Sequence, residues 1–339
     1  MGYDHDFLKH YNPDVIVWSI RAFYIFASYA ILIVRFIPDL RSRFLNYGAR
    51  ADSASRYDIK DSVLPRWFRI QFDPVLDWLA DITVPHSWFR HFYICSSLCS
   101  AYWLFAHLNL AHYFPSAFEL SLTNPWEYRT MWARLMLQLQ GLRRLYECVH
   151  VAKPSRSRMW VGHYAIGIAF YVVTNVAIWI EPGKQVSLFC RLLTHTFAAL
   201  EAKISSPPVG VRGITPLVIL NAARVTACIL MFFYSSYKQY QVHAYLAGLK
   251  EYRVPDHPIF EDTNLVCPHY GYEVNIYVAL TMLTARDTRI LNTTMLCATS
   301  FVVVNLGVTA DMTKKWQMQK FPKQRPEIAK RRRMLGSIW

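Results

Sequence analysis

Long apolar runs separated by short polar segments limit what this chain can fold into. A transmembrane helix needs about 20 mostly apolar residues, and several segments of the 339-residue chain approach this requirement. They are residues 15–36, 91–114, 129–150, 160–180, 214–237, 268–284 and 290–308. Because a backbone in lipid must satisfy its hydrogen bonds internally, the pattern predicts an all-α, polytopic membrane protein with about seven transmembrane helices.

The composition favours the same class of protein. Hydrophobic residues make up 53% of the chain and charged residues only 18%, whereas a soluble domain carries about 25% charged residues. The net charge of +14 does not indicate a nucleic-acid partner, because nine Lys or Arg residues fall within residues 314–333. Such a basic flank is typical of a cytosolic segment that touches anionic lipid. Residues 1–14 are polar and acidic, which favours a retained first span over a cleavable signal peptide.

Basic segments predict the orientation in the membrane. Residues 39–85, 153–158 and 314–333 are rich in Lys and Arg, whereas residues 115–128 contain neither. With seven spans the three basic segments fall on one side, and the positive-inside rule makes that side, together with the C-terminus, cytosolic. We interpret the shorter apolar run at 186–200 as interfacial or re-entrant, because an eighth span there would break this agreement.

A pair of ionisable residues enters the sixth span. His269 and Glu273 lie four residues apart within residues 264–277, which places them on one helical face. Pro268 suits the first turn of that helix. Ionisable groups in a membrane-length segment are costly and should face protein or a water-filled cavity. The alternative is a pair at the helix end that simply reaches the membrane interface.

The third span is unusually polar. Gln140, Arg143, Arg144 and Glu147 recur at offsets of three, four and seven residues, so one helical face carries all four. Pairing of either arginine with Glu147 would reduce the cost of burying them. This face therefore either lines a cavity or belongs to an interfacial helix with an ordinary ion pair.

A third polar group follows the fifth span. Gln239 and His243 are four residues apart, and Lys250 and Tyr252 come next. Cations beside a tyrosine are suited to a phosphate-bearing ligand. The sequence has no Gly-rich phosphate loop, no Gly-x-Ser-x-Gly nucleophile and no spacing typical of metal ligands, so a nucleotide would have to lie within the helical bundle. The seven cysteines are scattered without a CxxC pair, which argues against a zinc site or a disulfide framework.

Several of these motifs together resemble one protein family. They are VPHSWFRHFY at 84–93, QGLRRLYE at 140–147, YRVP at 252–255, CPHYGYE at 267–273 and the pattern NLG…W…KFP at 305–322. In this order, over residues 84–323, the chain resembles the steroid 5α-reductase family in its polyprenol reductase branch. The QGLRRLYE block distinguishes that branch from the steroid-reducing one.

The resemblance implies a seven-helix reductase of the endoplasmic reticulum membrane that uses NADPH at a site open to the cytosol. It divides the chain into a first transmembrane helix with a basic cytosolic segment, 1–83, and a reductase membrane domain, 84–339. The half of that domain from about residue 214 onward would bind NADPH. By position, the cofactor-binding residues would be Gln239, His243, Lys250, Tyr252, His269, Glu273, Asn305, Thr309 and Lys314.

The chain departs from the family pattern in two places. Lys314 and Gln317 stand where the branch usually has a histidine and a tyrosine, and a lysine lacks the proton-transfer range of an imidazole near neutral pH. In the third span, Gly141 stands where the steroid branch has a tyrosine before its arginine. These departures leave open the alternative that the chain is a reductase-like membrane protein without catalytic activity.

The implied reaction constrains the substrate. Hydride addition to a C=C bond needs an electron sink, which an unsaturated aldehyde has in its carbonyl oxygen and an allylic alcohol lacks. We therefore expect NADPH-dependent reduction of the α-isoprene double bond of a polyprenal, in preference to free polyprenol, in the dolichol synthesis that supports protein N-glycosylation. Another lipid or terpenoid enone is the alternative substrate. A donor must stabilise the enolate oxygen; the candidates are Tyr93, Tyr146 and His91, with Glu147 and Arg143 as orienting groups.

Overall fold

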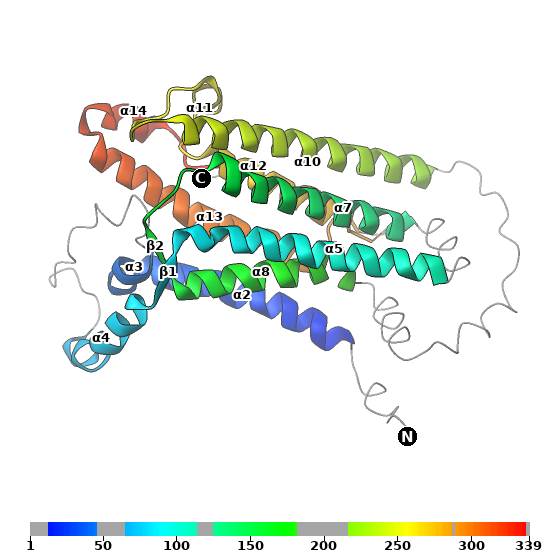
Figure 1. The fold of residues 1–339 in the computed structure, drawn as a ribbon, viewed down its shortest axis with the longest axis horizontal. Helices are drawn as coiled ribbons and strands as arrows, with labels where there is room; N and C mark the ends of the chain where they lie inside the picture. The colour runs from blue at the N-terminus through cyan, green and yellow to red at the C-terminus, as the bar shows by residue number, and fades with distance from the viewer. Residues whose placement is uncertain (1–12, 46–64, 114–124, 182–215, 287–288, 337–339) are drawn as a thin grey trace, which may run out of the picture.

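The long helices run side by side along the longest dimension of the protein (Figure 1). The computed structural model describes residues 13–45, 65–113, 125–181, 216–286 and 289–336. Apart from one two-stranded sheet, this part of the chain consists of helices and their connections, which confirms the all-α prediction. The long helices are α2 (Pro13–Phe36), α5 (Phe89–Tyr113), α7 (Pro125–Tyr146), α8 (Val161–Ile180), α10 (Pro216–Gly248), α12 (Pro268–Leu283) and α13 (Thr293–Lys320).

Four of these helices, α2, α8, α10 and α13, are long and apolar enough to cross a membrane. Of the others, α7 carries four arginines and α12 has only 16 residues. The structure therefore supports the membrane fold, while the count of about seven spans stays a prediction. The apolar run at 186–200 lies outside the described residues.

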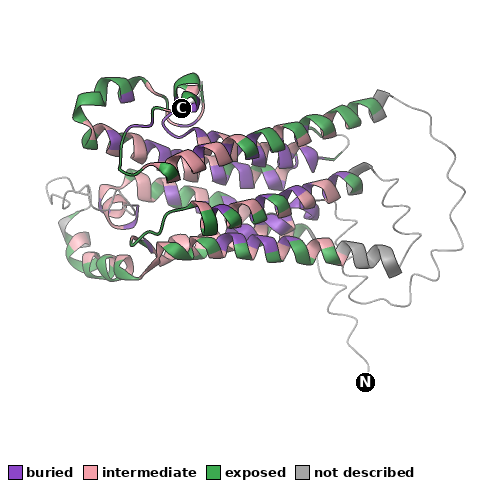
Figure 2. Cartoon of the chain, turned by 45° about the horizontal axis from the view of Figure 1, so that its top comes forward, coloured by how far each residue is buried: buried purple, intermediate pink, exposed green. Residues whose placement is uncertain are grey.

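Helix α2 shows how the bundle divides its side chains between protein and lipid. Tyr24 and Ile31 on one face are buried, and the face packs mainly against α13. Phe26, Tyr29 and Phe36 on the other face are 71%, 61% and 74% exposed. Figure 2 shows the same division across the bundle, with buried residues turned inward and exposed residues on the outer faces. An outward face that is apolar in the middle of a membrane helix is the surface that contacts lipid.

The central helix is α12. Its residues Ile276, Ala279, Leu280 and Leu283 have no exposed surface, and it packs against α10, α13 and α7. Pro268 occupies the first turn of the helix, as expected for a position that needs no backbone donor. The sixth predicted span is therefore a buried helix that α10, α13 and α7 pack against.

Two helices extend beyond their predicted ends. Helix α10 continues to Gly248 and α13 continues to Lys320, more than ten residues past the limits that hydropathy indicated. No proline interrupts either extension, so polar residues continue the helices beyond the apolar segments. Gln239 and His243 consequently lie inside α10, and Lys314 lies on α13.

The short elements gather at one end of the bundle, on the left in Figure 1. Strands β1 (Thr83–Pro85) and β2 (Arg158–Trp160) pair antiparallel, with Val84 opposite Met159. The helices at this end are α3 (Pro38–Phe44), α4 (Arg66–Asp81), α11 (Pro258–Thr263) and α14 (Arg325–Lys330), with short turns η3 (His86–Trp88), η4 (Glu147–Val151) and η7 (Pro322–Gln324). The described parts of all three basic segments thus lie at the same end.

Residues after α14 return to the start of α12. Arg332 pairs with Leu265 in a parallel bridge, and the amides of Val266 and Cys267 donate to the carbonyls of Arg332 and Arg333, both at 2.8 Å. Gly271 allows this close approach, because a Cβ there would lie 2.5 Å from the carbonyl oxygen of Met334. The basic C-terminal segment therefore covers the N-terminal end of α12.

Asp311 on α13 fixes this end from a second side. Its carboxylate accepts from Arg333 Nε at 2.7 Å and from Arg35 at the end of α2, and Lys315 Nζ lies at 3.1 Å. One buried carboxylate thus links α2, α13 and the segment after α14, and the several cations offset the cost of removing it from water.

Because the basic segments lie at one end of the bundle, we can predict where an external protease cuts the chain. In sealed microsomes, protease should remove a C-terminal epitope tag without detergent, because the positive-inside rule predicts that the basic end faces the cytosol. A matched tag inserted between residues 115 and 128 should be removed only after detergent is added. Immunoblotting measures both tags. Survival of the C-terminal tag together with loss of the inserted tag would show that the orientation is reversed.

Candidate active site

Glu147 lies at the centre of a buried polar network. It is 2% exposed and begins the π-helical turn η4, directly after α7. Its carboxylate accepts from Arg143 and Arg144, four and three residues earlier, and lies 2.7 Å from His243 Nδ1 on α10. The i,i+3 and i,i+4 spacings place both guanidinium groups on the side of the helix that carries Glu147. The two cations on one carboxylate offset the cost of burying these charges.

Arg144 connects this carboxylate to a tyrosine on α5. Its Nε and Nη2 donate to the hydroxyl oxygen of Tyr93 at 3.2 and 3.0 Å, and its guanidinium carbon lies 5.0 Å from the centre of the ring. Tyr93 is 4% exposed and packs edge-on against Tyr171 and Phe89. Because both bonds use the oxygen as acceptor, the O–H proton of Tyr93 is left to donate, and no described side chain accepts it.

Two glutamine amides carry the network from Arg143 to Glu273 on α12. Gln140 Oε1 accepts from Arg143 Nη2 at 2.7 Å while its Nε2 donates to Glu273 Oε2 at 3.2 Å. Gln239 on α10 makes the same two kinds of bond, accepting from Arg143 and donating to Glu273. A guanidinium only donates and a carboxylate only accepts, so both amides have a defined orientation.

Two histidines from α10 and α12 lie beside these groups. The rings of His243 and His269 are 5.3 Å apart in an edge-on arrangement. Arg144 Nη1 lies 2.6 Å from His243 Nδ1, the atom that also faces Glu147. Nδ1 of His269 is buried and has no hydrogen-bond partner among the described residues. A buried nitrogen without a partner is uncommon in folded proteins, so this atom marks a place where a polar ligand could bind.

The structure brings most of the sequence-predicted residues together from five elements. Tyr93, Arg143 and Glu147 join Gln239, His243 and Glu273 in the network, with His269 at its edge. His91 and Tyr146 lie outside it: His91 Nδ1 is 3.1 Å from the hydroxyl of Tyr164 on α8, and Tyr146 is 53% exposed with its ring against His150.

The other predicted cofactor residues lie toward the basic end of the bundle. Lys250 and Tyr252 are exposed, and the Tyr252 ring is 5.5 Å from that of Trp316 on α13. Lys314 donates to the carbonyls of Ala329 and Arg331 at 2.8 and 2.6 Å, so its ammonium holds the end of α14. Asn305 and Thr309 occupy α13, where the Thr309 hydroxyl donates to the Asn305 carbonyl at 2.9 Å.

The sequence did not single out every member of the network. Gln140 and Arg144 were recognised as part of the polar face of the third span, but neither was assigned a role at the site. In the structure Arg144 is the connection between Tyr93 and Glu147, and Gln140 is a connection between Arg143 and Glu273. The i,i+3 spacing of Arg144 and Glu147 was the available signal. The contact with Tyr93 depends on the packing of α5 against α7, which no local pattern predicts.

The side chains at this site fit the polar groups of a dinucleotide. Glu273 accepts through Oε2, while its Oε1 receives no bond from the described residues. Together with His269 Nδ1 it offers acceptors and a donor inside the bundle, and the exposed Lys250 and Arg253 supply positive charge at the basic end. This division suits a ligand with a polar base at one end and phosphates at the other. Within the described residues, no three His, Cys, Asp or Glu side chains are grouped as metal ligands would be.

Comparisons with known proteins agree with the resemblance found in the sequence. Residues 185–338 match the family model described as 3-oxo-5-alpha-steroid 4-dehydrogenase. The chain is 27% identical over 285 residues to polyprenal reductase 1 of Oryza sativa subsp. indica, covering 71% of this chain and 77% of that protein. It is 26% identical over 267 residues to polyprenal reductase of Caenorhabditis elegans, with coverages of 71% and 76%. The match to polyprenal reductase of Saccharomyces cerevisiae is 26% over 211 residues, with coverages of 62% and 61%.

These matches confirm the resemblance to the steroid 5α-reductase family and its polyprenal-reducing branch. They also confirm the expectation of an oxidoreductase that acts on a carbon–carbon double bond. The matched relatives include plant, worm and yeast proteins, all named for the same activity.

The central position of Glu147 predicts a large loss of stability when its charge is removed. Glu147→Ala leaves Arg143 and Arg144 buried without their carboxylate, and breaking a buried ion pair costs about 3–5 kcal/mol. Thermal unfolding of the purified protein in detergent should show a clearly lower midpoint. The matched control is Glu251→Ala, because Glu251 is exposed and such surface changes stay within about 0.5 kcal/mol. Equal midpoints for the two variants would contradict the central role of Glu147.

Proposed function

We propose that the chain is an NADPH-dependent polyprenal reductase of the endoplasmic reticulum membrane, acting in dolichol synthesis for protein N-glycosylation. The observation that carries the proposal is Tyr93: its oxygen accepts two bonds from a buried arginine, and its proton is free to donate. The matches to polyprenal reductases support the choice of substrate. Reduction of the α-isoprene double bond then requires a hydride source and a group that holds charge on the aldehyde oxygen.

NADPH, when bound, supplies the hydride that the β-carbon of the unsaturated aldehyde receives. As the C–H bond forms, the π electrons move toward the carbonyl oxygen, which becomes an enolate oxygen. Tyr93 is placed to donate a hydrogen bond to that oxygen, and the charge of Arg144 beside the phenol stabilises the negative charge that develops there. A proton added later at the α-carbon gives the saturated aldehyde.

The residues around Tyr93 fix its geometry. Arg144 is held by Glu147, and Glu147 by His243, so the guanidinium has little freedom to turn away from the phenol. Donors that are fixed before the reaction starts require no reorganisation as charge develops. Tyr93 is therefore proposed as the donor, and Arg144, Glu147 and His243 as positioning residues.

Gly141 explains why the donor should come from α5. A Cβ at residue 141 would lie 2.9 Å from Ser97 Oγ and 3.2 Å from Ser96 Oγ, because α5 and α7 pack closely there. A tyrosine, which the steroid branch has at this position, would not fit without separating the two helices. Tyr93 lies three and four residues from these serines, on the helix that Gly141 allows to approach. We therefore propose that the hydrogen-bond donor lies on α5 in this chain, whereas the steroid branch has it at the position of Gly141 on α7.

The residues that we propose to bind the cofactor form two groups according to their position in the bundle. Glu273, Gln239 and His269 would bind the polar groups at the reactive end of NADPH, while Lys250 and Tyr252 would lie near its phosphates. Lys314 and Gln317 stand where the branch usually has a histidine and a tyrosine. Because Lys314 holds carbonyls of α14, it would act mainly by keeping the basic end of the bundle closed.

The cofactor assignment predicts weaker binding when its charged partners are removed. Glu273→Gln and Lys250→Ala should each raise the Kd for NADPH about tenfold, because a lost hydrogen bond to a charged group is worth about 1.5–3 kcal/mol. Titration of purified protein, followed by fluorescence of the reduced nicotinamide, measures this. Lys323→Ala is the matched control, since Lys323 is an exposed cation in η7. Unchanged affinity in both test variants would move the nucleotide site elsewhere.

The donor assignment predicts a selective loss of turnover. Tyr93→Phe should lower kcat on the order of a hundredfold, as removal of an oxyanion donor does, while the Kd for NADPH stays the same. Tyr146→Phe removes the hydroxyl of an exposed tyrosine in the QGLRRLYE motif and should leave kcat nearly unchanged. Steady-state kinetics on the two variants compares the candidates directly. The opposite order of effects would assign the donor role to Tyr146.

The substrate assignment predicts which lipid is reduced. Purified protein with NADPH and no added dehydrogenase should reduce polyprenal much faster than polyprenol, because only the aldehyde has an electron sink. Deuterium from labelled NADPH should appear at the β-carbon, and mass spectrometry of the product measures it. Equal or faster reduction of the alcohol would refute the electron-sink argument. Reduction of a 3-oxo steroid in place of both would select the alternative, an enone reductase of another lipid class.

A further inference from the structure

Helix α4 carries several exposed apolar residues. Trp67, Ile70, Val75 and Trp78 are 66%, 70%, 50% and 63% exposed. At 3.6 residues per turn they spread over about 140° of the helix, an arc that also holds the exposed Gln71 and Asp81. On the opposite side, Arg69, Asp73, Leu76 and Ala80 are partly covered. The helix therefore turns a mixed side toward the protein and carries these four large apolar residues on its exposed side.

Several contacts fix the orientation of α4. Arg43 of α3 donates to Asp73 at 3.1 Å and to Asp77 at 2.6 Å. At the end of the helix, Trp160 Nε1 donates to the carbonyl of Leu79 at 2.9 Å. The Trp160 ring also lies 4.6 Å from Phe44, the last residue of α3. Because these contacts attach the middle and the C-terminal end of α4, the helix cannot simply rotate its apolar residues toward the protein.

The position of α4 along the bundle indicates what covers its exposed apolar residues. The exposed apolar residues of α2 continue to Phe36, which is 74% exposed, and α3 begins two residues later. Because α4 is attached to α3, it lies at the level where the lipid-facing surface of α2 ends. Figure 1 shows it there, beside α3 at the end of the bundle. A helix at this level with Trp at each end of its apolar face matches the aromatic belt at a membrane interface.

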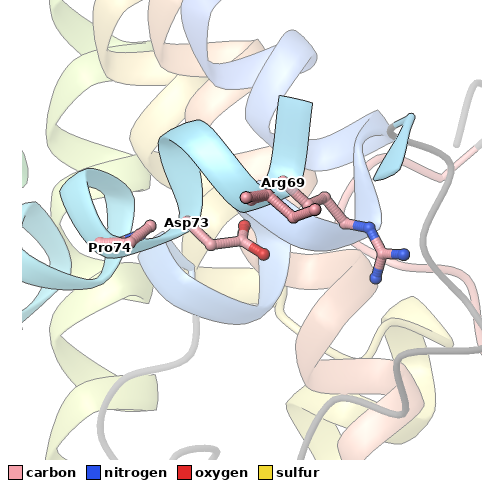
Figure 3. A pocket seen from close by; sticks show the side chains of 4 residues that line it. Arg69, Asp73 and Pro74 are labelled. Atoms are coloured by element: carbon pink, nitrogen blue, oxygen red, sulfur yellow. The ribbon is translucent and has the colours of Figure 1, made fainter. Parts of the chain in front are cut away.

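The charges around α4 indicate that a lipid without net charge is sufficient to contact its exposed apolar residues. Helices α3 and α4 together carry four arginines and four aspartates. The charges therefore balance, and two of the aspartates are paired with Arg43. Figure 3 shows Arg69 and Asp73 beside Pro74, where a shallow hollow of about 320 Å³ opens on α4. A balanced surface of this kind gives anionic headgroups little electrostatic advantage over zwitterionic ones.

We propose that α4 is an interfacial helix that inserts its Trp67–Ile70–Val75–Trp78 face into the cytosolic leaflet of the bilayer, with phosphatidylcholine as a sufficient partner. The surface is separate from the Glu147 network, whose members come from α5, α7, η4, α10 and α12. The proposal does not depend on the assigned reaction. An interfacial helix of this type buries its apolar side about 5–10 Å into the boundary between headgroups and acyl chains.

Photo-crosslinking of the full chain in nanodiscs tests the proposal. Benzoylphenylalanine is placed at Ile70, at Leu230 on the outer face of α10, which is 65% exposed, and at exposed Glu251. In discs of phosphatidylcholine alone, Ile70 should form lipid adducts as Leu230 does, and Glu251 should form none. Mass spectrometry of the adducts measures this, and size-exclusion chromatography checks that each variant is folded.

The other outcomes each overturn the proposal. Adducts between two copies of the chain at Ile70 would mean that a second copy covers the face. Lipid adducts that appear only after anionic lipid is added would assign the contact to headgroup charge. The absence of any adduct would place the face in water. As a second measurement, lipid with shallow bromines should quench the wild-type tryptophan fluorescence, and the double variant Trp67→Phe/Trp78→Phe should lose that quenched component.

Discussion

The site depends on one buried carboxylate that is shared by two arginines. Glu147 fixes Arg144, which reaches Tyr93 on α5, and Arg143, which reaches Glu273 on α12 through two glutamines. Each connection crosses to another helix, so α5, α7, α10 and α12 have one relative position in which all these bonds form. In a membrane, where apolar packing alone gives helices little preference for one partner, such polar contacts specify the arrangement.

Sequence patterns predicted the elements of this structure better than their contacts. The apolar runs predicted the long helices, because length and hydropathy follow from the bilayer itself. The i,i+4 spacings of Arg143 with Glu147, and of Gln239 with His243, predicted helical faces that the structure retains. Hydropathy predicted C-terminal ends for α10 and α13 that are too early. Both helices continue through polar residues beyond their apolar segments, and no proline stops them.

The contacts between helices could not be predicted in the same way. Nothing near Tyr93 in the sequence indicates that Arg144 would donate to it, because the contact depends on the close approach of α5 and α7 that Gly141 and two serines allow. His91, two residues from Tyr93, points to the other neighbour of α5 and contacts Tyr164 on α8. A resemblance to a family indicates which residues matter, whereas the packing determines which of them meet.

The pairing within α7 also has a consequence for how the protein is made. Helix α7 is synthesised before α10 and α12, so its charged residues leave the ribosome before His243 and Glu273 exist. Arg143, Arg144 and Glu147 lie within a single turn and can neutralise one another at once. Glu273 arrives later, and the amides of Gln140 and Gln239 are then already in place to receive it. The order of these residues along the chain thus lets each buried carboxylate meet its partners as soon as it is synthesised.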